Sequence, residues 1–145
     1  MGKRRKAREL ALQALYQVDF YGGENRPGLE LFWEEQKAGP EIRNFAQQLV
    51  EGALRRQSEI DRLIEKHSEH WKLSRMSRID RNILRLALSE LLEMDDIPYK
   101  VTIDEAIELA KKYGTSESGA FINGILDQVL KTLVKDKKIR KTENL

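Results

Sequence analysis

The sequence predicts an all-α domain of six or seven helices. Apolar residues recur at spacings of three and four along most of the 145 residues, as in helices that bury one face. The three prolines fall between these periodic segments. No segment alternates apolar and polar residues over the length of a strand, and the alternating residues at 99–101 are too few to count as one. We therefore expect helices joined by loops.

The first helix is predicted over residues 4–20. Two apolar stripes run along it, one of them through Tyr16 and Phe20, so we expect neighbouring elements to cover the helix on two sides. A glycine pair at 22–23 ends this helix, and the loop continues through residues 27–28.

A short helix is predicted next over residues 29–36, and a Gly-Pro break separates it from its successor. Pro40 suits the first turn of the following helix, because an N–H at that position would have no partner within the helix. The helical pattern then continues from 41 to about 67. Ser58 is a candidate cap for a separate second piece of this segment.

The densest apolar pattern covers residues 76–94 and predicts a central helix that is buried on most sides. Residues 102–105 read Thr-x-x-Glu, a capping box that predicts the start of the next helix. Gly114 closes that helix. We expect either Ser116 or Ser118 to cap the last helix.

The length and pattern predict one domain over residues 1–145, with an N-terminal helical half of about 1–70 and a C-terminal half of about 71–138. Residues 139–145 form a basic tail. Two interpretations of this tail stay open: a frayed, solvated end, or an ordered segment that contributes to binding.

The charge is distributed unevenly along the chain. Residues 1–9 and residues 131–145 each carry a net charge of +4, whereas the whole chain carries +2, so the 121 residues between them sum to −6. Basic ends on a mildly acidic body indicate a local site for a polyanion. The N-terminal cluster runs directly into the first helical pattern, which predicts that a helix holds part of it.

The composition excludes several classes of protein. The chain has no cysteine, so disulfides, thiolate nucleophiles and cysteine zinc sites are excluded. The absence of cysteine also fits a protein of a reducing compartment. No apolar run approaches the ~18–20 residues of a membrane span, and the N-terminus lacks the apolar region of a signal peptide. We expect a cytoplasmic protein that does not bind membranes.

Catalytic motifs are missing from the sequence. It contains no P-loop, no dinucleotide-binding glycine motif and no nucleophile elbow. His67 and His70 are the only histidines, and no third metal ligand is evident near them. We therefore predict a protein that is not an enzyme and that uses neither a metal nor a cofactor.

Two places depart from local rules. Asn123 and Gly124 stand inside the last helical pattern, where both residues are unfavourable, and we expect Gly124 to let another helix approach closely. Three arginines between residues 78 and 85 form a possible basic stripe on the central helix. Asp80 lies among them, and we expect it to make an exposed surface contact.

Three blocks of sequence, in this order, resemble the NusB family of bacterial transcription antitermination factors. The first spans residues 4–16 and begins Arg-Arg-Lys-Ala-Arg-Glu. The second spans 71–111 and includes Ile-Pro-Tyr-Lys-Val-Thr-Ile-Asp-Glu-Ala, and the third is Phe-Ile-Asn-Gly-Ile-Leu-Asp at 121–127. Residues 21–70 are the least diagnostic part of the chain.

The resemblance implies an all-helical fold of two small bundles packed across each other. It also implies an RNA-binding factor without catalysis, which pairs with NusE, a ribosomal protein of the small subunit. This heterodimer is expected to bind the boxA element of nascent RNA, notably in ribosomal RNA leaders, and to join an antitermination complex on RNA polymerase. A homodimer of the free protein also remains open.

The basic N-terminal side chains are candidates for contacts to RNA phosphates and to exposed bases of a single strand. They are Lys3, Arg4, Arg5, Lys6 and Arg8. Position in the family adds Arg75, Arg85, Glu117 and Phe121 to the predicted RNA surface. Phe121 has two open interpretations, stacking on a base or packing in the core.

By the same resemblance, Tyr16 and Asp80 are predicted contacts to the NusE-type partner. The sequence departs from the family pattern at two places near the RNA surface: Ala120 stands where a basic residue is common, and Glu117 where aspartate is common.

A second class of function stays open, a helical protein-interaction module or homodimer without specific RNA binding. A related helical module occurs in ribosomal RNA cytosine methyltransferases, but that class needs a Rossmann-like domain and catalytic cysteines, which this chain does not have. The salt dependence of binding distinguishes an RNA-binding protein from a pure interaction module.

Overall fold

The structure is a computed structural model that describes residues 2–22, 26–69 and 71–136. Over these ranges it contains seven α-helices, one short 3-10 helix and no strand, which confirms the predicted all-α fold. The helices are α1 (Gly2–Phe20), α2 (Arg26–Glu35), α3 (Pro40–Arg55), α4 (Gln57–Lys66), the 3-10 helix η1 (Leu73–Arg75), α5 (Arg78–Glu93), α6 (Tyr99–Tyr113) and α7 (Ser118–Lys135).

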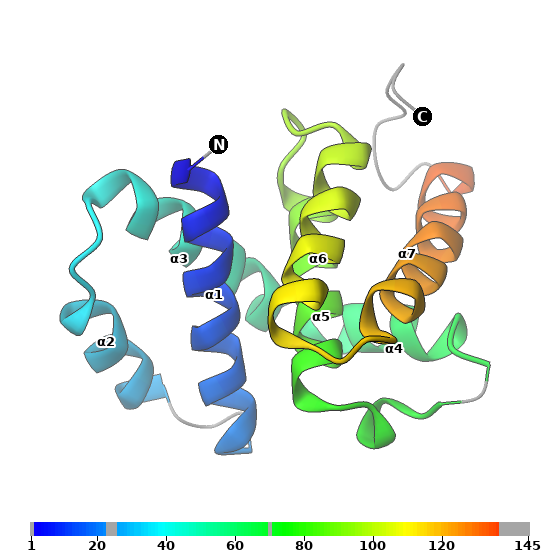
Figure 1. Ribbon diagram of the computed structural model, residues 1–145, viewed down its shortest axis with the longest axis horizontal. Helices are drawn as coiled ribbons and strands as arrows, with labels where there is room; N and C mark the ends of the chain where they lie inside the picture. Colours follow the sequence, from blue (N-terminus) through cyan, green and yellow to red (C-terminus); the bar gives the residue numbers. More distant parts are fainter. Residues whose placement is uncertain (1, 23–25, 70, 137–145) are drawn as a thin grey trace.

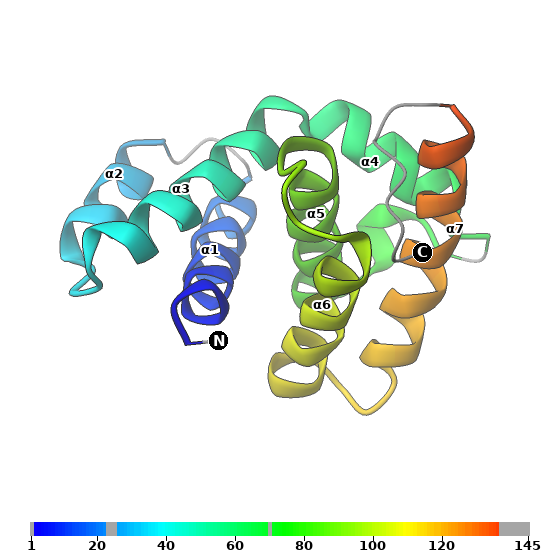
Figure 2. The same ribbon diagram turned by 90° about the horizontal axis from the view of Figure 1, so that it is seen from above.

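Helix α5 is the central element of the fold. Helices α1, α2 and α3 lie on one side of it, and α6 and α7 lie on the other (Figures 1 and 2). It contacts α1, α3, α4, α6 and α7, and every residue from Asn82 to Leu91 is buried. The prediction of a central helix buried on most sides is therefore confirmed.

The described helices form two groups, and both of them pack against α5. The first group is α1–α3, and the second is α4–α7 with η1. Helix α4 contacts α5, α7 and η1 as well as α3, so it belongs with the second group. The contacts divide these two groups of helices at Arg56, and the predicted halves of about 1–70 and 71–138 stay a prediction.

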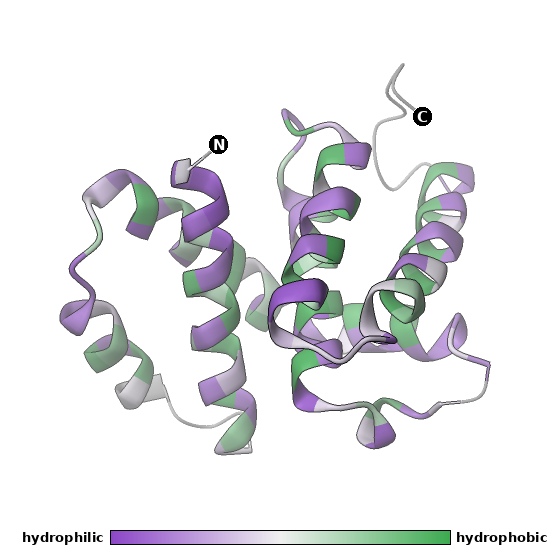
Figure 3. Ribbon diagram, in the orientation of Figure 1, coloured by the Kyte–Doolittle hydropathy of each residue, from purple (hydrophilic) through white to green (hydrophobic). Residues whose placement is uncertain are grey.

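Amphipathic patterning produces a continuous core between the helices. Hydrophobic and hydrophilic residues interleave along each helix (Figure 3). The largest fully buried side chains include Leu49 from α3, Ile60 from α4, Leu84 from α5 and Leu126 from α7. Burial of such apolar surface is the main favourable contribution to folding, so the core unites the two groups into one packed domain.

The helix starts differ from those that the sequence predicted. Helix α2 begins at Arg26, so residues 27–28 belong to its first turn and not to a loop. Ser58 lies inside α4, which starts after Arg56. Helix α7 starts after Glu117 and has no side-chain cap; Ser118 instead accepts a hydrogen bond from the Thr115 backbone N–H at 3.0 Å.

The predicted capping box at residues 102–105 is also wrong. Helix α6 starts one turn earlier, because Pro98 precedes it in the extended conformation and begins the helical path at Tyr99. Thr102 is therefore inside the helix, where its hydroxyl donates to the buried Glu90 carboxylate at 2.6 Å. Two other predictions of helix ends are confirmed: α3 begins at Pro40, and α6 ends before Gly114.

The close helix approach predicted at Gly124 occurs elsewhere. Asn123 and Gly124 are exposed, and a Cβ on Gly124 would meet no atom within 4 Å. The close approach between helices lies instead at Gly52, where a Cβ would lie 2.6 Å from the Ser89 hydroxyl of α5. Ser89 in turn donates to the Leu49 carbonyl at 2.8 Å, so α3 and α5 are in direct contact at this point.

The described part of the chain holds no helix that is long and apolar enough to cross a membrane. The same residues contain no group of three or more side chains that could ligate a metal ion. His67 joins α4 to α7, because its Nε2 lies 2.8 Å from the Thr132 hydroxyl and its Nδ1 lies 2.9 Å from the Leu63 carbonyl. His70 lies outside the described residues.

Candidate nucleic-acid interface

The basic N-terminal residues are held on the first turns of α1, as the sequence predicted, but in different environments. Lys3, Arg4 and Lys6 are exposed, Arg5 is half-buried, and Arg8 is buried. The helical period explains this gradient, because α1 packs one face against α3 and α5 and turns the other face to solvent. Only the outward residues of the cluster are open to a large ligand.

The exposed cations make contacts that a competing anion can replace. The Lys3 ammonium lies 2.9 Å from Glu41 on α3, and both side chains are about 70% exposed. Arg4 lies 3.7 Å from Asp96 and 4.8 Å from the centre of the Phe45 ring. Exposed ion pairs contribute little to stability because water and salt screen them. These side chains are therefore free to contact phosphates.

Arg8 occupies a different place from the one predicted for it. Its guanidinium donates two hydrogen bonds of 2.8 Å to the Glu90 carboxylate of α5, and its side chain is only 6% exposed. The Thr102 hydroxyl donates to the same carboxylate. Arg8 is thus committed to a buried ion pair that anchors α1, and its charge is not presented at the surface in this conformation.

A second set of predicted residues comes together in a hollow of about 320 Å3 between η1, α5 and the start of α7. Arg75, Asp80, Glu117 and Phe121 line it together with Trp71. The remaining lining residues are Met76, Ser77, Thr115 and Ser118. The structure therefore brings together residues assigned to RNA and one residue assigned to the partner protein.

Two aromatic side chains are available in this hollow. Trp71 is 52% exposed, and Phe121 is partly buried, packing against the core. Large exposed aromatic rings in a hollow suit stacking on a base or burial against a partner. Trp71 was not among the predicted site residues, although it opens the second family block. The available signal was a tryptophan without a place in any helical stripe.

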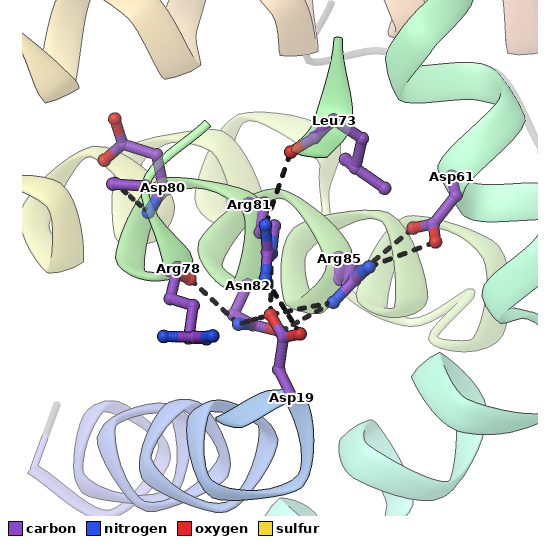
Figure 4. Close-up of polar contacts among 9 residues, drawn as sticks. Asp19, Asp61, Leu73, Arg78, Asp80, Arg81, Asn82 and Arg85 are labelled. Atoms are coloured by element: carbon purple, nitrogen blue, oxygen red, sulfur yellow. Dashed lines mark hydrogen bonds and ion pairs between the residues drawn. The ribbon is translucent and has the colours of Figure 1, made fainter. Parts of the chain in front are cut away.

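Asp80 lies in the first turn of α5. Its backbone N–H donates to the Ser77 hydroxyl at 3.0 Å, which caps the helix. Its carboxylate points away from the neighbouring arginine cluster (Figure 4). The Oδ1 atom is buried and has no hydrogen-bond partner within the described residues. This oxygen is an acceptor that a bound molecule can satisfy.

Two arginines of the predicted basic stripe on α5 are, like Arg8, held by carboxylates of other helices. Arg81 and Arg85 point toward Asp19 of α1, and Arg85 also makes two hydrogen bonds with Asp61 of α4, at 2.9 and 3.1 Å (Figure 4). The Arg85 side chain is 9% exposed. Arg85 is therefore a structural cross-link between α1, α4 and α5, and it is not placed at the predicted RNA surface.

Asp19 is ionised at the centre of this cluster. Burial by itself would raise the pKa of its carboxyl, but the hydrogen bonds from Arg81 and Asn82 and the charge of Arg85 hold the pKa below its ordinary value. The Arg81 Nε atom lies 2.7 Å from Asp19 Oδ2, and the Asn82 amide donates to the same oxygen at 2.8 Å.

Tyr16 lies on an exposed aromatic surface at the C-terminal end of α1. Tyr16 is 36% exposed, Phe20 55% and Tyr21 57%. The Arg78 guanidinium lies 5.2 Å from the centre of the Phe20 ring. The expectation that neighbours cover the second stripe of this helix is thus wrong at Tyr16 and Phe20. Sequence analysis missed Phe20 and Tyr21 as surface candidates because it assigned Phe20 to a covered stripe.

The described residues thus present a basic helix end, an aromatic-lined hollow and an exposed aromatic surface on an all-helical scaffold. These features define an all-helical module with separate basic and aromatic surfaces that are open to ligands. The model of the NusB family matches residues 5–131. The chain belongs to the NusB family.

Curated relatives match nearly the full length of the chain. The transcription antitermination protein NusB of Geobacter sulfurreducens is 53% identical over 92% of this chain and 97% of its own length. The corresponding protein of Myxococcus xanthus is 51% identical over 93% of this chain and 99% of its own length.

Solved structures share the fold. T. maritima NusB superposes with a TM-score of 0.82 at 43% identity, covering 93% of this chain and 95% of that one. A crystal structure of the antitermination factors NusB and NusE in complex with dsRNA contains a chain with a TM-score of 0.80 at 33% identity. That match covers 91% of this chain and 98% of the other.

Proposed function

We propose that this protein is a non-enzymatic transcription antitermination factor that binds boxA-type RNA of ribosomal RNA leaders as a heterodimer with NusE. Family membership and the names of its relatives support this proposal. The single structural observation that carries it is the exposed basic end of α1, where Lys3, Arg4 and Lys6 face solvent on a helix that the fold holds in place.

The RNA surface that we propose has two parts. Lys3, Arg4, Arg5 and Lys6 supply positive charge for phosphates at one end of α1. Arg75, Glu117 and Phe121 supply a cation, an acceptor and a stacking face in the hollow. Arg8 and Arg85 support this surface from inside the fold, because the buried Glu90 holds Arg8 and the part-buried Asp61 holds Arg85.

The partner surface that we propose lies around Tyr16 and Asp80. Exposed aromatic rings are typical anchors of protein interfaces, because they bury a large area at a small cost in side-chain entropy. Tyr16 stands beside the exposed Phe20 on α1, and Asp80 on α5 offers its Oδ1 atom, which accepts no hydrogen bond from any residue that the structure describes. We also infer that the heterodimer joins RNA polymerase in the cytoplasm, as the family resemblance implies.

The second candidate function is a homodimeric or purely protein-binding module. The exposed aromatic side chains at Tyr16, Phe20 and Tyr21 favour it, because such a surface can also pair with a second copy of the chain. Sedimentation of the free protein over a concentration series measures this directly.

The experiment that tests the proposal is RNA binding across a salt series. The probes are a labelled boxA-type single strand, a scrambled strand and a duplex, each with and without NusE. We expect NusE to tighten binding and the boxA strand to bind best. If about four phosphates are contacted, the slope of log K against log salt is near −3. Equal weak binding to all probes, or a flat slope, contradicts the proposal and favours the protein-binding module.

A further inference from the structure

Arg5 is the one member of the N-terminal cluster that is both partly exposed and firmly held. Its Nε and Nη2 atoms donate to the two oxygens of Glu105 on α6, at 3.1 and 2.7 Å. The Arg5 side chain is 37% exposed, whereas that of Glu105 is 13% exposed. A guanidinium has five N–H groups, so this two-point contact leaves three of them for another acceptor.

Glu105 is itself fixed from the interior. The Nη1 atom of the buried Arg8 lies 3.5 Å from Glu105 Oε1. Arg8 is held by Glu90, and Glu90 accepts from Thr102. Alternating charges therefore extend from the core, through Arg8 and Glu105, to the surface at Arg5. Each carboxylate fixes the orientation of the next guanidinium, since a two-point contact permits one planar arrangement.

The other cations of the cluster have no such support. Within the described residues, Lys3 contacts one exposed carboxylate. Arg4 lies 3.7 Å from another and 4.8 Å from the centre of the Phe45 ring, so neither cation is fixed by a two-point contact to a carboxylate. A phosphate that binds them must first order these long side chains, and that ordering reduces affinity. Arg5 has already been ordered by folding, which makes it the site where a phosphate is bound at the lowest entropic cost.

We propose that Glu105 is a positioning residue for RNA binding: its carboxylate fixes the Arg5 guanidinium so that the remaining N–H groups of Arg5 meet a phosphate. The inference rests on the proposed RNA-binding function and adds to it a residue that does not itself touch RNA. The ionised state of both groups supports it. The hydrogen bond with Glu105 raises the pKa of Arg5, and the hydrogen bond with Arg5 lowers the pKa of Glu105.

The substitution Glu105→Gln distinguishes a positioning role of Glu105 from a purely electrostatic one, because the two roles predict changes of opposite sign in RNA affinity. Removing a negative charge near the RNA should strengthen the binding of a polyanion. If Glu105 positions Arg5, Glu105→Gln should instead weaken RNA binding by roughly three- to tenfold, as expected for losing one ordered side chain. The sign of the change thus separates the two views.

Glu108→Gln is the matched control for this test. Glu108 lies on the same helix, is exposed, and makes its contact with Lys111 at 3.4 Å. It undergoes the same change of charge without touching Arg5. We expect Glu108→Gln to leave RNA affinity unchanged or slightly tighter, measured with NusE at one fixed salt concentration.

A double-mutant cycle tests whether Glu105 acts through Arg5. In an Arg5→Ala background, Glu105→Gln should have no further effect on RNA affinity. Arg5→Lys keeps the charge but cannot make the two-point contact, and it leaves the Arg8–Glu90 pair intact. It should weaken RNA binding to a similar extent with little change in the thermal midpoint, so the test holds even if Glu105→Gln unfolds.

Three results overturn the inference. The first is a Glu105→Gln variant that binds RNA as tightly as Glu108→Gln does. The second is an effect of Glu105→Gln that persists at full size in the Arg5→Ala background. The third is an Arg5→Lys variant with unchanged affinity. If the unchanged protein binds no RNA with NusE, the proposed function fails as well, so the two failures are distinguishable.

Discussion

The two ends of α1 hold basic–acidic contacts of the same chemistry in opposite environments. At the N-terminal end, Lys3 and Arg4 meet single carboxylates in positions that are mostly exposed. At the C-terminal end, Asp19 meets Arg81 and Arg85 where all three side chains are at most 14% exposed. The difference teaches that burial, and not residue type, decides whether an arginine is available to a ligand or is a structural element.

The physical basis of this difference is the cost of desolvation. Removing the partner of an exposed charge costs little free energy, because water replaces the lost contact. A buried charge that loses its partner has no such replacement and destabilises the fold. The N-terminal end of α1 can therefore exchange carboxylates for phosphates, whereas the C-terminal end cannot exchange its partners without cost.

The largest predicted effect is on stability at the buried end. Arg85→Ala removes the cation that pairs with Asp61, whereas Asp19 keeps Arg81 and Asn82. Because Asp61 is part-buried, we expect a loss of about 2–3 kcal/mol, below the value for a fully buried charge left unpaired. Chemical denaturation measures the loss in the free energy of unfolding. Arg62→Ala is the matched control, since Arg62 is an exposed arginine next to Asp61. A loss below ~1 kcal/mol for Arg85→Ala would contradict the comparison.

The next effect is on RNA affinity at the exposed end. Changing Lys3, Arg4 and Lys6 together to alanine removes three phosphate contacts if the proposed surface is right. The salt slope should then fall by about 2, and affinity at 0.1 M salt by about 100-fold. Because these side chains are exposed, the thermal midpoint should move little.

The contrasting variant in that experiment is Arg8→Ala. Arg8 is buried against Glu90, so its removal should lower the thermal midpoint clearly, unlike the triple change. The proposed difference between exposed and buried basic residues of α1 is contradicted if the triple variant unfolds, whereas Arg8→Ala keeps its stability and weakens RNA binding.

The smallest effect is a pH dependence at the buried end. The pKa of Asp19 is lowered in the folded protein, so its ionisation stabilises the fold above the ordinary carboxyl range. That contribution is lost as pH falls through the lowered pKa. The difference in stability between the unchanged protein and Asp19→Asn should therefore be widest near neutral pH and narrow below about pH 4. Denaturation curves that stay equally far apart down to pH 2 would contradict this role.

Sequence patterning predicted most of the helices, because the helical period is a local property. It placed the central helix correctly at α5 and its buried residues with it. It failed at several helix starts, where Thr102 and Ser118 looked like caps but bond elsewhere. Serine and threonine near a helix start fit several hydrogen-bonding roles, and only the neighbouring elements determine which one is used.

The roles of the candidate site residues stay predictions, and the sequence named these residues without their arrangement. It singled out the basic cluster, Glu117 and Phe121, yet it did not predict that Trp71 and Asp80 lie in the same hollow. The exposure of Phe20 was also missed. A stripe of apolar residues predicts a buried face only where another element arrives to cover it, and among the described residues Phe20 stays 55% exposed.

The sequence by itself determined the helical class, the central buried helix, the basic end of α1 and the family resemblance. Each of these depends on residue type and local spacing. Only the tertiary structure decided that Arg8 and Arg85 are internal cross-links and that Glu105 holds Arg5 at the surface. The partner of Arg8 lies 82 residues away in the chain, that of Arg85 lies 24 residues away, and that of Arg5 lies 100 residues away. Folding brings each carboxylate to its arginine, and the burial of that contact decides whether the arginine is available to a ligand.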